Sequence, residues 1–305
     1  MGSSERGSII LGSVTAICVV FFWSGWIVIS RLGVTGQLTI FDLTALRHGV
    51  GAVVALPYIM WSRAWRGLTP WRTLILTLTA GAPYALLSYS GFIFAPAAHG
   101  GVFLNGCLPI FTTLFAWTWL GQRSRFSQMV GLVIILAGVT LVGYEGFLSS
   151  GGSLTWIGDL LFLAAIALFA LFMVANQVWS VNPGQVIFSI TIVPAVVYIP
   201  IWLLWLNSNL TSAPASEIIL QGAYQGLVPS VVGISCLNIA VRHIGPRATS
   251  ALVSSVPVVA ALAAIPVLNE LPGLPAWIGM ITVSFGILLA LGIIGFHQQV
   301  ATAGE

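Results

Sequence analysis

Long apolar runs, separated by short breaks of glycine, proline, asparagine or charged residues, fill almost the whole chain. A helix needs about 20 apolar residues to cross the hydrocarbon core of a bilayer, and each run is close to this length. The pattern predicts ten transmembrane helices, at about 8–30, 41–62, 72–95, 97–120, 126–145, 155–178, 183–206, 216–241, 245–268 and 275–297. The expected fold class is therefore an all-α membrane protein.

The arginines give these helices an orientation, because cytoplasmic loops of membrane proteins carry an excess of positive residues. Eight of the ten arginines fall at alternate ends of the runs, on the side of the N-terminus: Arg6, Arg63, Arg66, Arg72, Arg123, Arg125, Arg242 and Arg247. Only Arg31 and Arg47 lie toward the other side, where acidic residues gather: Asp42, Glu145, Asp159, Glu217 and Glu270. We therefore expect both termini to be cytoplasmic.

An internal repeat becomes visible when residues 97–145 are laid over residues 245–293, an offset of 148. The matched positions are Leu108-Pro109-Ile110 with Val256-Pro257-Val258, Leu120 with Leu268, Gln122 with Glu270, Gly131 with Gly279 and Gly138 with Gly286. Apolar sequences share residues easily, so coincidence of composition is the alternative for any single match. The combined set favours a repeat.

The repeat divides the chain into halves at 1–150 and 151–305, each with five predicted helices. Because five is an odd number, the second half must enter the membrane from the opposite side. Inverted repeats of this kind are an architecture of transporters.

Composition supports a membrane protein and excludes several functions. The chain is 58% hydrophobic and 6% charged, with a mean hydropathy of +1.03, whereas soluble domains carry about 25% charged residues. It contains no lysine, which excludes a lysine Schiff base and a phosphate-binding loop of the ATPase type. The net charge of +3 has an explanation in membrane orientation, so nucleic acid is not an expected partner.

Polar and aromatic residues inside the runs are the candidate substrate site, because in hydrocarbon they must face other helices or a water-filled cavity. The candidates are Trp23, Tyr84, Ser88, Tyr89, Asn105, Asn176, Tyr224 and Asn238. The alternative interpretation for each is a hydrogen bond between helices, which serves packing. Pro109 and Pro257 occupy matched places in the two halves, and we interpret them as hinges, although proline is generally common in membrane helices.

Cysteines and histidines suggest neither a disulfide framework, a metal site nor an enzyme. Cys18, Cys107 and Cys236 all lie inside runs, and no two histidines share one face of a predicted helix, so no metal or other cofactor is expected. An intramembrane serine protease would need a histidine beside a serine such as Ser235, and the sequence offers no obvious partner.

The positions of the acidic side chains bear on whether export is driven by a proton gradient. No carboxylate lies near the middle of a run, and Asp42, Asp159, Glu217 and Glu270 are expected to stay ionised in water near the outer ends. A proton-driven exporter normally carries an ionisable group inside the membrane, so we expect facilitated export. His99 is the possible proton carrier on the alternative view, because histidine titrates near neutral pH.

The most specific stretches are Ala97 to Arg123, which ends in Trp119-Leu120-Gly121-Gln122, then Gly131 to Gly143, and their second copies Ser254 to Glu270 and Gly279 to Gly292. In these stretches the chain resembles the drug/metabolite transporter superfamily and its EamA-type exporters. That family usually has glutamate at the position of Gln122. The resemblance implies that helices one to four and six to nine surround a central cavity, and that amino acids or related metabolites leave the cell by alternating access.

The expected substrates are amino acids with aromatic or other neutral side chains, moving outward across a bacterial inner membrane. An apolar and aromatic cavity with a few hydrogen-bonding groups suits them. Phosphorylated substrates are disfavoured, since lysine is absent and Arg47 is the deepest arginine, not a mid-span one. A broad-range drug exporter is the main alternative, and an intramembrane enzyme is the alternative from another class. Besides the substrate and the lipid bilayer no partner is expected; a monomer is expected, with a dimer as the alternative.

Overall fold

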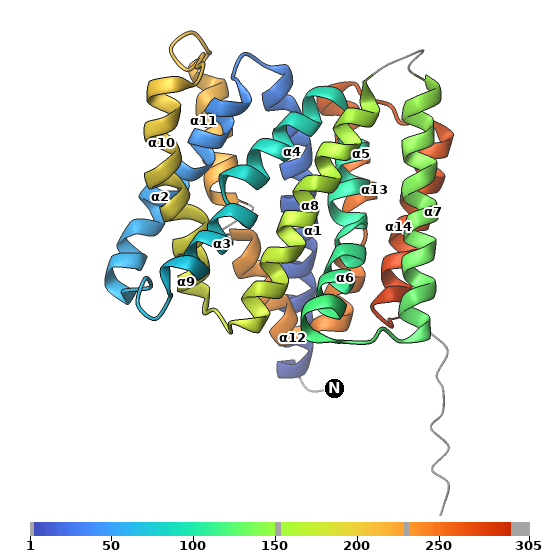
Figure 1. The fold of residues 1–305 in the computed structure, drawn as a ribbon. Coiled ribbons are helices and arrows are strands. Elements are labelled where there is room, and N and C mark those ends of the chain that lie inside the picture. The colour runs from blue at the N-terminus through green and yellow to red at the C-terminus, as the bar shows by residue number, and fades with distance from the viewer. Residues whose placement is uncertain (1–2, 150–153, 229–231, 294–305) are drawn as a thin grey trace, which may run out of the picture.

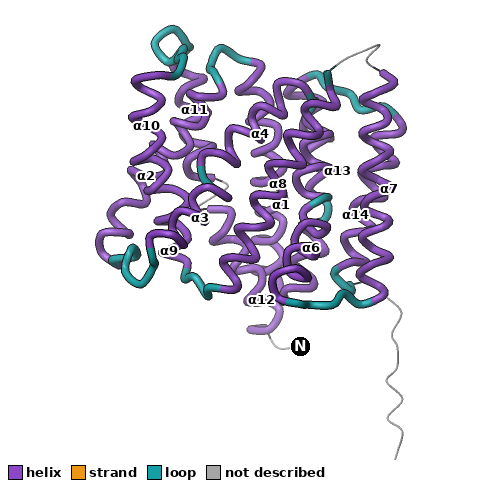
Figure 2. The backbone as a smooth tube through the Cα atoms, in the orientation of Figure 1, coloured by secondary structure: helices purple, strands orange, loops and turns teal. Residues whose placement is uncertain are grey.

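The computed structural model of the protein describes residues 3–149, 154–228 and 232–293, and every regular element in these ranges is a helix (Figure 2). The elements are α1 (Ser3–Thr35), α2 (Ile40–Ser62), α3 (Pro70–Ala80), α4 (Ala82–Phe94), α5 (Ala97–Gly100), η1 (Gly101–Gly106), α6 (Leu108–Leu120), α7 (Phe126–Ser149), α8 (Thr155–Val178), α9 (Pro183–Ile187), η2 (Phe188–Ile192), α10 (Val193–Trp205), α11 (Ala215–Leu227), α12 (Gly233–Val253), α13 (Val256–Leu268) and α14 (Leu274–Ala290). The predicted all-α fold is confirmed for the described part of the chain.

Seven helical segments in the described ranges are long and apolar enough to cross a membrane: Gly7–Thr35, Ile40–Ser62, Ala97–Leu120, Phe126–Gly146, Thr155–Val178, Pro183–Trp205 and Ala248–Leu268. The other three expected runs differ in form. The run at 72–95 is divided into α3 and α4, the run at 216–241 passes through residues outside the described ranges, and α14 has 17 residues. Many large apolar side chains lie on the outside of the bundle, Trp61 at 83% and Phe126 at 84% exposure among them, as expected for a surface that faces lipid.

The division of the third run at Gly81 has a local cause. Pro83, in the first turn of α4, has no N–H to donate to a carbonyl in the preceding turn, so a continuous helix would lack one hydrogen bond here. A Cβ atom at Gly81 would also lie 2.8 Å from Cγ of Pro194 in α10. Glycine at the break therefore lets α10 approach closely.

The helices pack in pairs that join the two halves of the chain (Figure 1). α1 packs against α12 and α13, and α8 packs against α4 and α6. α2 lies against α10 and α11, and α7 lies against α14 at one edge of the bundle. Figure 1 places the N-terminus at the lower end of the bundle; below, "lower" and "upper" refer to this orientation.

Small residues bring α7 and α14 into close contact. A Cβ atom at Gly138 would lie 2.7 Å from the carbonyl oxygen of Gly279, and one at Gly279 would lie 2.7 Å from the carbonyl oxygen of Gly138. A Cβ atom at Gly286 would lie 2.9 Å from the carbonyl oxygen of Gly131. The two backbones therefore touch, in the manner of small-residue contacts between membrane helices.

The matched prolines lie at the beginnings of helices and not inside them. Pro109 is in the first turn of α6, after a break at Cys107, and Pro257 is in the first turn of α13, after a break at Ser254 and Ser255. A proline at this place loses no helical hydrogen bond. The two prolines therefore do not interrupt a helix, and the hinge prediction depends on the breaks beside them.

The expectation that water surrounds the outer acids is wrong for two of the four. Asp42 has no exposed surface and Asp159 is 6% exposed. Asp42 is enclosed because the segment after α10 folds over the start of α2: its carboxylate accepts hydrogen bonds from Trp202 Nε1 (2.9 Å), Ser208 Oγ (2.6 Å) and the Asn209 backbone N–H (2.9 Å). It also accepts from the backbone N–H and the hydroxyl of Thr39, which completes a capping box. His48 and His99 are buried as well.

Candidate functional site

A guanidinium group inside the bundle marks the candidate site. Arg47 is the eighth residue of α2, about 12 Å along the helix from its cap at Thr39. Its guanidinium carbon lies 5.6 Å from the centroid of the Trp26 ring and 5.9 Å from that of Tyr84. The Arg47 side chain therefore lies among rings of neighbouring helices inside the bundle.

Three helices build the aromatic part of this site. Trp26 of α1 and Tyr84 of α4 stack with ring centroids 6.3 Å apart and an interplanar angle of 14°. Phe169 of α8 lies 5.2 Å from Tyr84, and Phe92 of α4 meets Trp26 edge to face at 6.4 Å. We call Trp26, Tyr84, Phe92 and Phe169 the aromatic cluster; cation–π contact with two of its rings stabilises the Arg47 charge.

A buried hydrogen-bond network adjoins the cluster. The Tyr89 hydroxyl donates to Gln225 Oε1 (3.0 Å), and Gln225 Nε2 lies 3.1 Å from both Ser30 Oγ and Gln221 Oε1. Gln221 in turn donates to the Ile29 carbonyl oxygen at 2.9 Å. The network joins α4, α11 and α1, and its two glutamines have no exposed surface. Buried polar groups that are fully bonded fix the relative positions of helices.

The predicted site residues are distributed unevenly around this centre. Tyr84 belongs to the aromatic cluster and Tyr89 to the network, while the Ser88 hydroxyl donates to the Tyr84 carbonyl oxygen within α4 (2.8 Å). The Tyr224 hydroxyl donates to the Phe22 carbonyl oxygen (3.1 Å), and Trp23 lies close to Gly233 of α12.

The three predicted asparagines lie apart from the cluster. Asn105 donates to the Gly101 carbonyl oxygen of its own helix, Asn238 is exposed, and Oδ1 of Asn176 is buried without a hydrogen-bond partner among the described residues. Among those same residues, no hydrogen bond or ring contact connects the three to Arg47.

The sequence prediction missed Arg47, Trp26 and the two glutamines. A signal for Arg47 was present, because it is an arginine inside an apolar run and an exception to the orientation of the others. Such intramembrane charges are usually functional. Trp26 and the glutamines carried no distinguishing pattern, since many aromatic and polar residues occur at similar places in the runs.

At the upper end, the wall of a pocket of about 280 Å³ includes His99 and Glu270, each of which is paired with a residue outside the lining. It is lined by Pro96, Ala98, His99, Glu145, Gly146, Thr155, Ala264, Glu270, Leu271, Pro272 and Ala276. His99 Nδ1 lies 2.8 Å from the Asp159 carboxylate. Glu270 accepts from Arg31 Nε at 2.6 Å and from the Ala97 backbone N–H at 2.7 Å.

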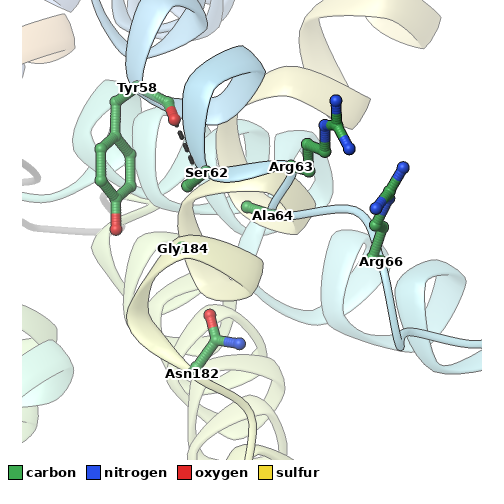
Figure 3. A pocket seen from close by; sticks show the side chains of 7 residues that line it. All are labelled: Tyr58, Ser62, Arg63, Ala64, Arg66, Asn182 and Gly184. Carbon is green, nitrogen blue, oxygen red and sulfur yellow. Dashed lines mark hydrogen bonds between the residues drawn. The ribbon is translucent and has the colours of Figure 1, made fainter.

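A second pocket of about 280 Å³ lies at the lower end, between the end of α2 and the start of α9 (Figure 3). It is lined by Tyr58, Ser62, Arg63, Ala64, Arg66, Asn182 and Gly184. Arg63 and Arg66 are exposed and lie on one side of it, facing away from Asn182. This pocket lies at the surface and does not adjoin the aromatic cluster. Among the described residues no group of three or more histidine, cysteine or acidic side chains could hold a metal ion.

Comparison with known proteins assigns this architecture to a family. The model of the EamA-like transporter family matches residues 10–144 and again residues 156–292. A solved crystal structure of a protein with 18% sequence identity superposes with a TM-score of 0.62, over 96% of this chain and 99% of that one. That likeness concerns the fold alone.

Curated relatives are transport proteins by name. A probable terminal-alkyne amino-acid exporter of Streptantibioticus cattleyicolor is 23% identical over 74% of this chain and 75% of its own length. Solute carrier family 35 member F6 of Homo sapiens is 31% identical over 41% of this chain and 38% of its own length. The uncharacterized transporter YvbV of Bacillus subtilis is 35% identical over 21% of this chain and 20% of its own length.

Proposed function

Because the chain belongs to the EamA-like transporter family, matched along both of its halves, we propose that it exports amino acids with aromatic or other neutral side chains across a bacterial inner membrane. The observation that carries the proposal is the aromatic cluster beside Arg47 in the interior of the bundle. Apolar walls with a few placed polar groups suit such substrates. The relative named as an amino-acid exporter supports the same substrate class.

For the architecture, we propose ten membrane spans in two inverted repeats, residues 1–150 and 151–305. If a twofold axis relates the halves, a contact between two residues implies a contact between their two counterparts. Gly131 corresponds to Gly279 and Gly138 to Gly286 at the offset of 148. The contact of Gly131 with Gly286 therefore implies a contact of Gly279 with Gly138, and both occur.

Alternating access completes the proposal. The proposed cavity lining is Trp23, Tyr84, Ser88, Tyr89, Asn105, Asn176, Tyr224 and Asn238, and the hinges are the breaks beside Pro109 and Pro257. The two broken helices meet each other, since a Cβ atom at Gly101 would lie 3.3 Å from Cα of Pro257. Bending at both breaks would open the bundle at alternate ends.

A broad-range drug exporter is the second candidate, because aromatic walls also accept apolar cations. For the energy source we propose facilitated export. The buried pair of His99 and Asp159 is the alternative coupling site, because it places an imidazole beside a carboxylate inside the upper end. We propose a transporter rather than an enzyme, and a monomer in the bilayer.

We expect residues at the two ends of the bundle to be labelled from opposite sides of the membrane. In a variant without Cys18, Cys107 and Cys236, single cysteines replace Gln37 or Gln122, both exposed residues. A maleimide that cannot cross membranes should label position 37 in intact spheroplasts and position 122 only after the membrane is opened. The reverse result would contradict the proposed orientation.

In liposomes, we expect protein-dependent efflux of phenylalanine, tryptophan and leucine down their gradients. Tyr84→Ala, Asn105→Ala and Asn238→Ala should each lower the flux several-fold, because the proposal places these side chains against the substrate; unchanged flux at unchanged protein levels would assign them to packing. Val133→Ala is the control, because Val133 is 64% exposed on α7 at the edge of the bundle. Absence of protein-dependent flux for all twenty amino acids would refute the proposed substrate class.

The same liposomes distinguish the two energy sources. Under facilitated export, an imposed pH gradient should not drive accumulation against the amino-acid gradient, and His99→Ala should leave the flux unchanged. Uphill accumulation that is lost in His99→Ala would instead assign coupling to the pair of His99 and Asp159.

A further inference from the structure

Arg47 is a cation without an anionic partner. Among the described residues, Arg31 forms an ion pair with Glu270 and His99 is hydrogen-bonded to Asp159, and neither pair involves Arg47. Its Nη1 atom is buried and has no hydrogen-bond partner among the described residues. A guanidinium carries five N–H donors, which are satisfied best by carboxylate or phosphate oxygens.

The surroundings of Arg47 stabilise its charge only in part. A charge inside a membrane protein is costly unless it pairs with another charge or faces a water-filled cavity. The rings of Trp26 and Tyr84 contribute cation–π contact and the Tyr89 side chain is a hydrogen-bond partner, but none of the three carries a negative charge. Arg47 therefore lacks a negatively charged partner among the described residues, and an anion that enters the site would supply this partner.

We propose that Arg47 binds the carboxylate of the transported substrate and thereby selects carboxylic acids. This inference rests on the proposed function and narrows it. The stacked rings of Trp26 and Tyr84 hold the planar guanidinium in place, so that two parallel N–H groups can meet both carboxylate oxygens. Tyr84 and Phe169 offer ring faces to the apolar side chain of the same substrate.

The proposal separates this chain from a broad-range drug exporter. An apolar cation would meet the Arg47 charge with repulsion, and an amide or a decarboxylated amine would leave the guanidinium without an anion. The class of substrates is then amino acids and other monocarboxylates with an aromatic or apolar side chain. Phosphate groups fit less well, because the other arginine that contacts the cluster, Arg31, donates to the Phe92 carbonyl oxygen and is already paired with Glu270.

Binding to purified protein in detergent tests the role of Arg47. The probes are L-phenylalanine, 3-phenylpropionate, L-phenylalaninamide and 2-phenylethylamine, and the variants are Arg47→Gln and Arg47→Lys. Arg72→Gln is the matched control, because Arg72 of α3 lies 5.5 Å and 5.6 Å from the rings of Trp71 and Trp179, neither of which belongs to the cluster. Calorimetric titration gives the dissociation constants, and the unliganded melting temperature reports folding.

We expect the wild type and Arg72→Gln to bind the two carboxylates at least about tenfold more tightly than the amide and the amine. Arg47→Gln should weaken carboxylate binding by about ten- to a hundredfold, the usual range for losing a hydrogen-bonded charged partner. The affinity of Arg47→Lys for carboxylates should lie between those of the wild type and Arg47→Gln, because lysine keeps the positive charge but lacks the paired N–H donors of a guanidinium.

Three results would overturn the proposal. They are unchanged carboxylate binding in a folded Arg47→Gln, equal affinity of the wild type for phenylalanine and its amide, and no binding of either carboxylate to the wild type. If Arg47→Gln does not fold, the proposal is tested by carboxylate binding to Arg47→Lys and by the affinities of the wild type for L-phenylalanine and L-phenylalaninamide. Flux in liposomes separates this inference from the proposed function: selective binding without flux would refute export and leave the carboxylate site standing.

Discussion

Asp42→Asn is expected to lower the free energy of unfolding by about 3 kcal/mol, which would be among the largest effects of any single substitution in this protein. The buried carboxylate accepts hydrogen bonds from Thr39, Trp202, Ser208 and Asn209. An asparagine keeps one acceptor oxygen and turns an NH₂ group toward donors. Buried donors would then lose their partners, at about 1–3 kcal/mol each, and the cap of α2 would weaken. Unfolding in mixed detergent micelles, followed by tryptophan fluorescence, measures the change.

Glu217→Gln is the matched control for Asp42→Asn. Glu217 also accepts backbone N–H groups from a nearby turn, those of Gln37 at 3.0 Å and Leu38 at 3.2 Å. It is only partly buried, so water can replace the lost interactions and the effect should be about 1 kcal/mol or less. Equal stability losses in the two variants would show that the enclosure of Asp42 contributes nothing.

Gly138→Ala is expected to destabilise the protein by about 3 kcal/mol, at the upper end of the range for overpacking. The added methyl group would lie 2.7 Å from the Gly279 carbonyl oxygen and 2.9 Å from the Val283 backbone nitrogen. These obstructing atoms belong to the backbone, so α7 and α14 can avoid the clash only by moving apart. The higher helix propensity of alanine, about 1 kcal/mol, is too small to reverse the sign.

A second glycine of α7 provides the control. At Gly143 a Cβ atom would find its nearest neighbours at 3.6 Å and 3.9 Å, which is ordinary van der Waals contact. Gly143→Ala should therefore be neutral or slightly stabilising in the same unfolding assay. If Gly138→Ala were equally neutral, the close contact of α7 with α14 would not exist in the protein. Gly279→Ala should reproduce the loss, since it meets the Gly138 carbonyl oxygen in the same way.

Much of the fold follows from local sequence. The length of seven of the ten apolar runs predicts a helical segment of about the observed length, because each helix satisfies its own backbone hydrogen bonds and must be apolar outside to lie in lipid. The paired glycines at 131, 138, 279 and 286 were visible as a repeat, and their backbone contacts are those expected of inverted halves. The interruption between α3 and α4 was not predicted from Pro83. The structure explains it, because Pro83 lies in the first turn of α4.

The sequence predicted a site of polar and aromatic side chains inside the bundle, but it identified only some of the residues that form it. Tyr84 and Tyr89 were found because a polar residue inside an apolar run must face the interior of a bundle. The direction that a side chain takes toward a distant helix has no such local signal, and for that reason Trp26, Gln221 and Gln225 were missed. Arg47 was noticed as the deepest arginine and as an exception to the pattern of orientation, but it was not placed among the site residues.

By itself, the sequence determined which segments are helices and that the chain belongs in a membrane, since hydropathy, charge and proline act on their own segments. Only the tertiary structure decided which polar groups are buried and what they meet. Asp42 is enclosed by residues more than 150 positions away, and Arg47 is held by rings from α1 and α4. Burial and pairing are properties of helices brought together in space, and one-dimensional hydropathy contains no information about which neighbour will cover a given side chain.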